Sequence, residues 1–419
     1  MLIKGKELKM NWVDIIFFFY MFVGLYMMSL FFFIYFPNKK DLFNYPPSKI
    51  VPVSIVMPCY NEAEHIGNAI ESLTNLDYPK NMLEIIIVDD KSTDNSAEII
   101  KKYTKKYENV RLIANKKNSG CAAVPTNIGI KASKFDYVVV ADSDSTPEKD
   151  ALKKMLGFLQ QDKKTAAVTC SIITKEPKTF IQKLQSIEYV IICFNRKLLD
   201  LVDAVYVTPG PFALYKKDIL LKVGLFDTKN LTQDIEIVWK LLSYGYKARM
   251  CLSAKVYTAT PEKFKKWWKQ RVRWNMGGTQ TLIKYKSLIL KKGMLGAFII
   301  PFFSLSLFLG LFGLALFTYL WSRRLLTSYL STKYSFYADT TILRLEDLTF
   351  APSILNFFGI VLFILGLSFT YLALIVIKEK TLKHKNILNI MFYILIYLTV
   401  YPTIMITALY KIARGKYTW

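Results

Sequence analysis

The sequence predicts an α/β domain with a mainly parallel, doubly wound sheet, joined to a helical membrane region of about four spans. Short apolar runs alternate with amphipathic stretches between residues 37 and 260, which is typical of successive β-α units. Longer apolar runs flank this domain, and hydrophobic residues make up 53% of the 419-residue chain. A large water-facing core and membrane helices can therefore coexist in one chain.

The membrane region is predicted from runs of about 20 apolar residues, the length that crosses a bilayer as a helix. The first run follows an N-terminal tail, residues 1–11, and is too long for the core of a signal peptide. The expected spans are residues 12–36, 297–321, 354–377 and 387–410. The expected domains are the α/β domain at 37–260, interfacial helices at 261–296 and a C-terminal membrane region at 297–419.

Basic residues beside the spans predict the orientation of the chain in a cell membrane. Lys39, Lys291 and neighbouring lysines border the large domain, and further lysines fill the short segment 378–386. We therefore expect residues 37–296 and 378–386 in the cytosol and residues 322–353 outside. The basic residues at the two chain ends do not follow this pattern, so the orientation of the tails stays open.

Charge and residue types limit the classes of function. The chain has 56 Lys and Arg against 32 Asp and Glu, a net charge of +24 that suits anionic lipid or phosphorylated substrates. The basic residues are spread along the chain without a recognised binding module, so no nucleic-acid partner is expected. The 5 cysteines form no C-x-x-C pair and only 2 histidines are present, so catalysis has to depend on carboxylates.

Polar residues follow three of the four strands expected in the first part of the domain. These strands are residues 53–57, 84–88, 110–114 and 137–141. Tyr60, Asn61 and Glu62 follow the first strand, and Asp90 follows the second. Ligands of a doubly wound sheet bind outside the carboxyl ends of its strands, so we expect these residues to line one crevice. A helix is expected after the first strand, with Asn61 and Glu64 as its capping pair.

Asp142 and Asp144 follow the fourth strand, two residues apart. Carboxylates at this spacing provide hard oxygen ligands for Mg²⁺ or Mn²⁺ beside the phosphates of a substrate. Asp, Asn and Ser are also common in turns, so the strand-end residues taken alone leave a purely structural role open.

Three later segments carry more information through their order and spacing. The first two are Thr208 to Phe212 and Thr232 to Asp234. In the third, Gln270, Arg273 and Trp274 share one helix face because they are spaced at i, i+3 and i+4. Arginine suits a diphosphate, and the indole can pack beneath it. Lysines and aromatic residues crowd the same stretch, so an interfacial amphipathic helix is the alternative for its other faces.

With these motifs in this order, the chain resembles the family-two glycosyltransferases over about residues 51–278. It is most similar to the membrane branch that contains hyaluronan, chitin, cellulose and poly-N-acetylglucosamine synthases and ceramide glucosyltransferase. The motifs are Asp89-Asp90, Asp142-Ser143-Asp144, Thr232-Gln233-Asp234 and Gln270-Arg271-Val272-Arg273-Trp274.

The resemblance implies a GT-A fold for the large domain, Mg²⁺ or Mn²⁺ as cofactor, and a role for each matched residue. Asp234 becomes the catalytic base, while Asp142 and Asp144 hold the ribose and the metal. The implied donor-binding residues are Tyr60, Glu62, Asp90, Asp142, Asp144, Gln270, Arg273 and Trp274. The implied acceptor-side residues are Pro209, Gly210, Gln233 and Trp274.

Two residues depart from the family pattern. Gln233 replaces the usual Glu beside the base, which removes one charge and keeps the Asp. Cys121 stands where many relatives have a Lys near the donor, so a cation that could meet the phosphates is absent there.

The implied reaction is inverting transfer of a sugar from a nucleotide-sugar, expected to be a UDP-sugar, to a growing glycan at the bilayer. One carboxylate base is sufficient for it, because no covalent intermediate has to form. Transfer of a single sugar to a lipid or polyprenyl phosphate is the alternative within the enzyme class. A membrane transporter or scaffold is the non-enzyme alternative, although no ionisable residue interrupts the interior of an expected span.

Overall fold

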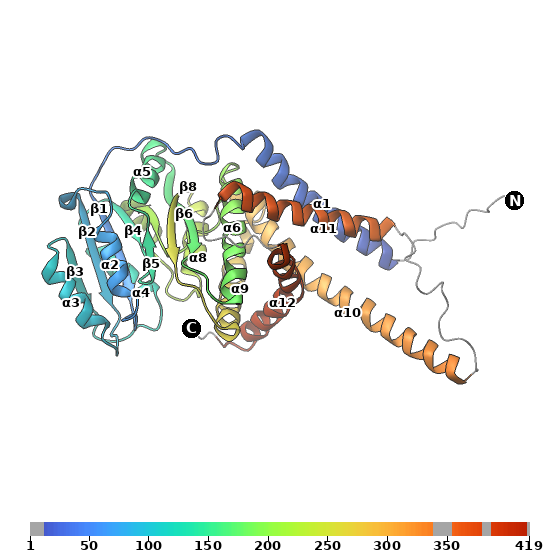
Figure 1. Ribbon diagram of the computed structural model, residues 1–419. Helices are drawn as coiled ribbons and strands as arrows, with labels where there is room; N and C mark the ends of the chain where they lie inside the picture. The colour runs from blue at the N-terminus through green and yellow to red at the C-terminus, as the bar shows by residue number, and fades with distance from the viewer. Residues whose placement is uncertain (1–11, 338–353, 379–386, 417–419) are drawn as a thin grey trace. The chain divides into compact units, whose positions relative to one another are not determined.

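The structure is a computed structural model that describes residues 12–337, 354–378 and 387–416. The described chain forms two compact units (Figure 1). One unit extends to Ile34 and continues from Leu305 to Leu372, and the other comprises Tyr35–Ser304 and the residues from Ala373 onward.

The second unit contains one sheet whose described strands have the order β3-β2-β1-β4-β7-β6-β8-β5. The strands are β1 Val53–Cys59, β2 Leu83–Asp89, β3 Val110–Ala114, β4 Tyr137–Val140, β5 Ser145–Pro147, β6 Thr165–Thr174, β7 Ala213–Lys216 and β8 Lys247–Thr258. β1 is parallel to β2 and β4, β2 to β3, and β6 to β8, whereas β7 and β5 run antiparallel to their neighbours. The predicted mainly parallel sheet is confirmed.

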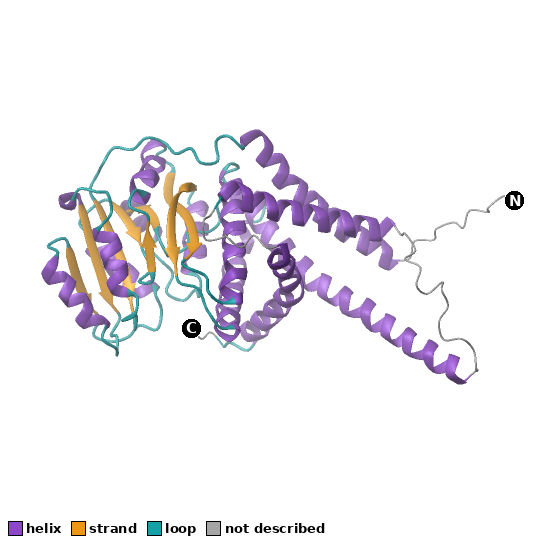
Figure 2. Cartoon of the chain, viewed as in Figure 1, coloured by secondary structure: helices purple, strands orange, loops and turns teal. Residues whose placement is uncertain are grey.

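Helices surround the sheet on both faces (Figure 2). They are α2 Ile66–Thr74, α3 Ser96–Lys106, α4 Ala123–Ala132, α5 Ala151–Gln161, α6 Phe180–Asp200, α7 Lys217–Val223, α8 Gln233–Ser243 and α9 Phe264–Tyr285. Alternate residues of β1 face opposite sides: Ile55 lies in the core with Ile70 of α2, whereas Val56 meets Gly129 of α4. A sheet covered on both faces requires apolar strands, and every residue of β2 is buried.

The register of β1, β2 and β3 places their motif residues along one edge of the sheet. The ladder of hydrogen bonds continues past the strand ends, with Asp90 N donating to Cys59 O and Asn115 N to Asp89 O, both at 2.8 Å. Because β4 is parallel to β1, Asp142 leaves the sheet at the same edge. The strand ends therefore converge as the sequence predicts.

The predicted capping pair of the first helix is wrong. α2 begins at Ile66 after His65, and no side chain caps it. The Asn61 side chain instead accepts a hydrogen bond from the backbone N of Thr93 at 2.8 Å, because the chain makes a short turn between β1 and α2.

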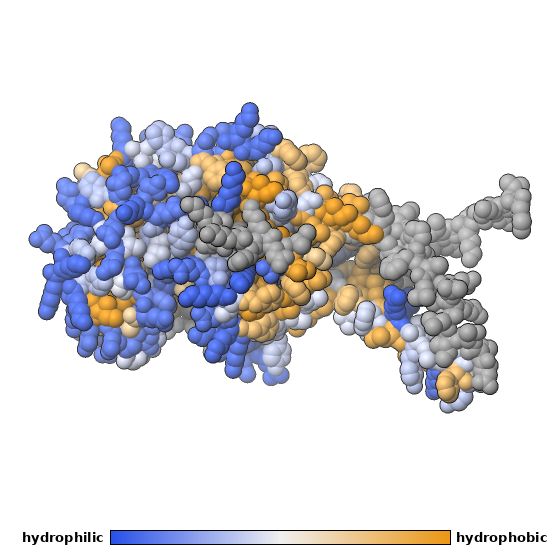
Figure 3. All heavy atoms as spheres, in the orientation of Figure 1, coloured by the Kyte–Doolittle hydropathy of each residue, from blue (hydrophilic) through white to orange (hydrophobic). Residues whose placement is uncertain are grey.

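Four helices have the length and apolar composition to cross a membrane, among the residues that the structure describes. They are α1 Trp12–Asn38, α10 Ile300–Tyr337, α11 Ile354–Ile377 and α12 Ile387–Ala413. A π-helical turn, Leu295–Ile299, precedes α10, and the helix continues beyond the expected end at residue 321. The visible face of the α/β domain is largely hydrophilic, and apolar residues gather on these helices (Figure 3). Residues 338–353 and 379–386, for which an orientation is predicted, lie outside the described residues.

The candidate spans are divided between the two units. In the first unit, Phe31 of α1 packs against Phe369 of α11 with ring centroids 5.6 Å apart. α12 belongs to the second unit, where Ile404 and Ala408 pack against Trp267 and Met276 of α9. The last candidate span is therefore part of the same compact unit as the sheet.

Candidate active site

The loops that follow β1 and β2 are fastened to each other. Asn61 and Lys91 have φ angles of 54° and 66°, the left-handed region, where each chain turns sharply away from its strand. Thr93 N donates to the Asn61 side chain, and Asn61 N donates to Ser92 Oγ at 3.0 Å. The two loops therefore form one rim, on which Tyr60 keeps 47% of its surface exposed.

Both carboxylate oxygens of Asp90 bind the loop that follows β3. Oδ1 accepts a hydrogen bond from Asn115 Nδ2 at 2.7 Å, and Oδ2 accepts from Ser119 N at 2.9 Å and Ser119 Oγ at 2.6 Å. Asp90 is buried, and Cys121 belongs to the same loop. Any ligand that reaches Asp90 therefore meets a carboxylate whose orientation is already fixed.

Glu62, Asp142, Asp144 and Asp234 form one acidic cluster. Burial among protein atoms raises the pKa of Asp142, and the negative charges of Asp144 and Asp234 raise it further. Burial, followed by the charge of Asp144, also raises the pKa of Glu62. Thr258 Oγ1 donates to Asp144 Oδ1 at 3.2 Å and orients this carboxylate. Mutual repulsion of this kind is relieved when a cation binds.

Gly210 lies directly against the carboxylate of Asp142. A Cβ atom at this position would lie 2.6 Å from Oδ1 and 2.8 Å from Oδ2 of Asp142, closer than real side-chain contacts. The segment around Gly210 also touches the next site element, because Thr208 N donates to the backbone O of Asp234 at 3.4 Å. The backbone of this segment therefore forms a wall of the acidic cluster.

Asp234 is the second residue of α8, and the positive charges of two arginines influence its pKa. Burial raises the pKa of Asp234, while the positive charges of Arg273 and Arg196 oppose this rise. Asp234 Oδ1 also accepts a hydrogen bond from Ile235 N at 3.1 Å. Burial lowers the pKa of Arg273, while the negative charges of Asp234 and Asp142 oppose this change. The expected base and one expected metal ligand therefore act on the same guanidinium.

Helix α9 holds the loop that leads into α8. Arg273 Nη1 donates to Leu231 O at 3.1 Å, and Gln280 Oε1 accepts from Leu231 N at 3.1 Å. A Cβ at Gly277 would lie 2.6 Å from the backbone N of Thr232, so only a glycine allows the helix this close. The position of Asp234 therefore depends directly on α9.

Gln270 and Trp274 both contact the side chain of Arg271. Arg271 Nη1 donates to Gln270 Oε1 at 2.6 Å, and the Arg271 guanidinium lies 4.1 Å from the centre of a Trp274 ring. The helix predicted from the i, i+3, i+4 spacing is present as α9. Gln233, at the start of α8, has a buried Oε1 for which the described part of the chain offers no hydrogen-bond partner.

Residues 54–224 match the family described as glycosyl transferase family 2. Over this segment the chain is similar to family 2 glycosyltransferases, and the predicted resemblance to this family is confirmed.

Curated relatives of this chain include synthases from two staphylococci. It is 33% identical over 267 residues to poly-beta-1,6-N-acetyl-D-glucosamine synthase of Staphylococcus epidermidis, covering 63% of this chain and 64% of the relative. It is 34% identical over 249 residues to the protein of the same name from Staphylococcus aureus strain COL, covering 59% of each. The matched region thus spans less than two thirds of the relatives' own length.

The fold of the family 2 domain is also found in a solved structure. Mannosyltransferase PcManGT from Pyrobaculum calidifontis, in complex with GDP-Man and Mn²⁺, superimposes with a TM-score of 0.52. The match covers 65% of this chain and 76% of that chain at 20% sequence identity. The predicted GT-A-like α/β domain with four candidate spans is confirmed.

The family 2 site fits a divalent cation whose other ligands come from a substrate. Among the described residues, no group of three or more His, Cys, Asp or Glu side chains is arranged to hold a metal ion. Mg²⁺ is commonly held by one or two carboxylates together with substrate phosphates and water. Asp142 and Asp144, with their unrelieved repulsion, provide such a pair.

Three buried charged residues around the site were not predicted from the sequence. Arg196 of α6 is 3% exposed, and its Nε and Nη1 have no hydrogen-bond partner among the described residues. Glu188 of α6 pairs with Arg271 of α9. Arg271 belongs to a motif recognised in the sequence, but it does not lie on the helix face predicted to be functional. Glu188 and Arg196 lie in the long helix α6, where no sequence motif indicates a role for them.

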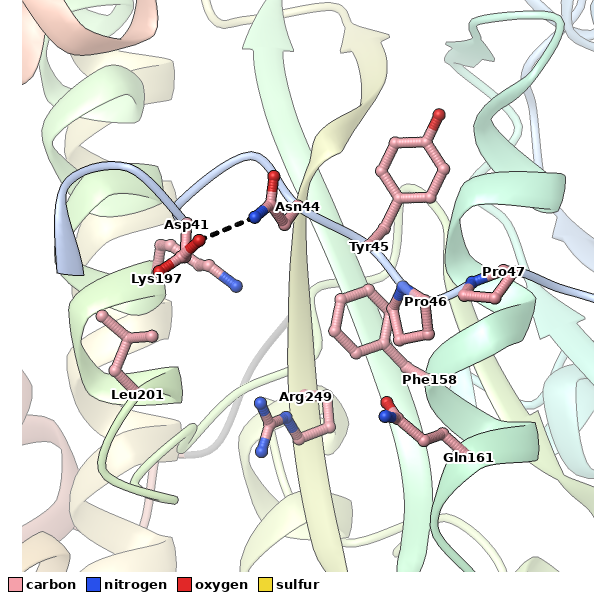
Figure 4. Close-up of a pocket in the computed structure, with 10 residues that line it drawn as sticks. All are labelled: Asp41, Asn44, Tyr45, Pro46, Pro47, Phe158, Gln161, Lys197, Leu201 and Arg249. Atoms are coloured by element: carbon pink, nitrogen blue, oxygen red, sulfur yellow. Dashed lines mark hydrogen bonds between the residues drawn. The ribbon is translucent and has the colours of Figure 1, made fainter.

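A hollow of about 340 Å³ lies elsewhere in the family 2 domain (Figure 4). It is bordered by residues 41–47, by Phe158 and Gln161 of α5, and by Arg249 near the start of β8. β8 runs parallel to β6, so its start lies at the edge opposite the motif-bearing strand ends. None of the predicted site residues lines this hollow.

Proposed function

We propose that this chain is an inverting, processive glycosyltransferase that adds sugars from a UDP-sugar to a growing glycan, with poly-N-acetylglucosamine as the class of product. The observation that carries the proposal is the position of Arg273 at the strand ends of a family 2 domain, where the charges of both Asp234 and Asp142 act on it. The names of the staphylococcal relatives support the product class.

In the proposed reaction, Asp234 accepts the proton of the acceptor hydroxyl as the hydroxyl oxygen attacks the anomeric carbon of the donor. The new glycosidic bond forms while the bond from that carbon to the diphosphate breaks, which inverts the configuration. Arg273 is proposed to bind the departing diphosphate, and its positive charge favours the ionised form of Asp234. Gly210 and its neighbours limit where the acceptor can enter, because they cover Asp142.

A divalent cation on Asp142 and Asp144 would neutralise negative charge on the leaving diphosphate. Tyr60 is exposed on the rim and is proposed to pack against the base, with Asp90 oriented beneath it. Glu62 completes the donor side of the site, and Pro209, Gln233 and Trp274 form the acceptor side. Gln270 lies between the two sides, along the diphosphate of the donor and the acceptor entrance.

The proposed membrane orientation has residues 37–296 in the cytosol and the segment between α10 and α11 outside. The donor nucleotide is then supplied from the cytosol, and the candidate spans adjoin the product. The substitution Leu345→Cys, followed by thiol labelling in sealed vesicles, tests this orientation. Labelling only after the vesicles are opened from the cytosolic side would contradict it.

The deciding experiment follows product size over time. Purified full-length protein is incubated with excess radiolabelled UDP-N-acetylglucosamine, with and without EDTA, followed by Mg²⁺ or Mn²⁺. A ladder that lengthens with time, loss of activity on chelation and recovery with metal support the proposal. If the product is a single sugar on extracted lipid, the enzyme performs one-step transfer and the proposed processive extension is wrong. If turnover does not depend on metal, the proposed role of the metal is wrong. The variant Asp144→Ala should lose the metal response.

A further inference from the structure

A buried ion pair links two helices behind the site. Arg271 of α9 is 0% exposed and Glu188 of α6 is 4% exposed. Arg271 Nε donates to Glu188 Oε1 at 3.0 Å, and Nη2 donates to Glu188 Oε2. This two-point contact fixes the plane of the guanidinium and not only its position.

The plane of Arg271 determines what lies on both sides of it. One side meets Trp274, at 4.1 Å from a ring centre, and a second indole, Trp267, lies at 5.6 Å. The remaining nitrogen, Nη1, donates to Gln270 Oε1 at 2.6 Å. A single guanidinium therefore touches both Gln270 and Trp274.

Helix α12 closes this arrangement from the side of the candidate membrane span. Trp267 is 3% exposed and meets the ring of Tyr397 edge-on, with centroids 6.0 Å apart. Tyr397 stacks in turn on Tyr401 at 5.7 Å. The ion pair is thus enclosed by aromatic rings from two helices.

Packing alone is a poor explanation for a buried ion pair. Removing two charges from water is costly, and well-packed apolar side chains of similar volume often stabilise a protein equally well. A bidentate pair adds a defined orientation, which apolar side chains do not provide.

We propose that Glu188 is a positioning residue for the acceptor: through Arg271 it sets the angle at which the Trp274 indole and the Gln270 amide meet the acceptor sugar. This inference deepens the proposed transferase function and rests on it. The sugar's apolar face would stack on the indole, and a hydroxyl group would bind the amide. α12 holds the assembly closed.

The test is a double-mutant cycle on the full-length protein with UDP-N-acetylglucosamine and a short N-acetylglucosamine oligomer as acceptor. Glu188→Gln should raise the acceptor KM by about tenfold and leave the affinity for UDP within about twofold. In the Trp274→Phe background the same substitution should change the acceptor KM by less than about twofold, because its route of action is already removed. Equal effects in both backgrounds, or no effect on the acceptor KM, would overturn the proposal.

The matched control is Glu84→Gln, which breaks a second Glu–Arg pair, formed by a buried Glu84 and a partly exposed Arg111. Glu84 Oε1 accepts from Arg111 Nε at 2.9 Å between β2 and β3. It should lower the melting temperature without changing the acceptor KM. If Glu188→Gln does not fold, Arg271→Lys replaces it: the charge stays and the flat stacking surface is lost, so the acceptor defect should persist. A normal acceptor KM in a folded Arg271→Lys protein would equally overturn the proposal.

A fluorescence measurement separates failure of this inference from failure of the proposed function. The emission of Trp274, taken as the difference between wild type and Trp274→Phe, should change when Glu188→Gln is introduced into both. If wild type transfers no sugar but this emission changes, the proposed function fails and the Glu188 to Trp274 coupling stands. An unchanged emission refutes the coupling itself.

Discussion

The donor rim and the acceptor side of the site are held together in different ways. The donor rim, the loops after β1, β2 and β3, depends on hydrogen bonds among short polar side chains such as Asn61, Asp90 and Ser119. The acceptor side, formed by α6, α8, α9 and α12, depends on close helix approach and buried charges. All rim contacts form within one stretch of chain, whereas the acceptor side joins segments far apart in sequence.

This difference determines how far a local change spreads. Loss of one hydrogen bond in the rim should disturb only the loop that it joins, because several other hydrogen bonds still hold each loop. A displaced helix on the acceptor side moves every residue it carries, since packed elements shift as units. Substitutions of similar size should therefore have larger effects on the acceptor side.

The largest effect is expected at Asp234. Asp234→Asn should lower transfer by at least about 10³-fold while leaving UDP affinity nearly unchanged, because the group acts in proton transfer. Single-turnover transfer and equilibrium binding of UDP measure the two quantities. Near-normal turnover would exclude Asp234 as the base.

The wild-type pH profile tests the same residue. The proposed base role requires an ionised Asp234, and burial raises the pKa of Asp234, so transfer should be lost as the pH falls through that raised value. The acid limb of kcat/KM should therefore lie above the range of an ordinary aspartate. An acid limb at or below that range would contradict the assignment.

The next effect compares two adjacent glycines of α9. Gly277→Ala forces a Cβ into Thr232 and should lower transfer by about 10²-fold by displacing Asp234. Gly278→Ala meets nothing within 4 Å and should leave transfer unchanged while stabilising the helix by about 1 kcal/mol. Activity and melting temperature are measured together. Similar activities of the two variants would remove the proposed dependence of Asp234 on α9.

A smaller effect is expected in the donor rim. Asp90→Asn places an amide group where Asn115 and Ser119 both donate, so it should weaken UDP binding by about tenfold. The acceptor KM should not change, because the hydrogen bonds of the Asp90 carboxylate go to Asn115 and Ser119 of the rim. Isothermal calorimetry with UDP measures the first quantity. A matching rise in the acceptor KM would show that the two sides are coupled.

The smallest effect concerns Arg196. Its charge opposes the rise in the pKa of Asp234, so Arg196→Met should move the acid limb of kcat/KM to higher pH. Rates on the pH-independent plateau should stay within about threefold of wild type. An acid limb that stays in place would show that Arg273 alone sets the ionisation of Asp234.

The sequence predicts the donor rim better than the acceptor side. Short apolar runs followed by Asp90 or Asp142 are local patterns, and parallel strands necessarily bring such ends to one edge. The pairing of Glu188 with Arg271 joins residues 83 positions apart on helices whose packing no local pattern specifies. The close contact of Gly277 with Thr232 is equally non-local, so a glycine inside a helix carries no sign of its purpose. The capping prediction is wrong for a different reason. Asn61 fits the local rule for a helix cap, but its side chain binds Thr93 in another loop instead.

Because α12 belongs to the same compact unit as the sheet, the proposed active site is completed only late in synthesis of the chain. α9 ends at Tyr285, but the helix that encloses Trp267 begins only at Ile387 and ends at Ala413. At translation rates of about 5–20 residues per second, α9 waits on the order of ten seconds for its partner. During this interval the apolar face of α9 has no cover from α12. A ribosome-bound chain would thus carry a complete donor rim and an unfinished acceptor side, so sugar transfer could begin only after the final helix has entered the bilayer.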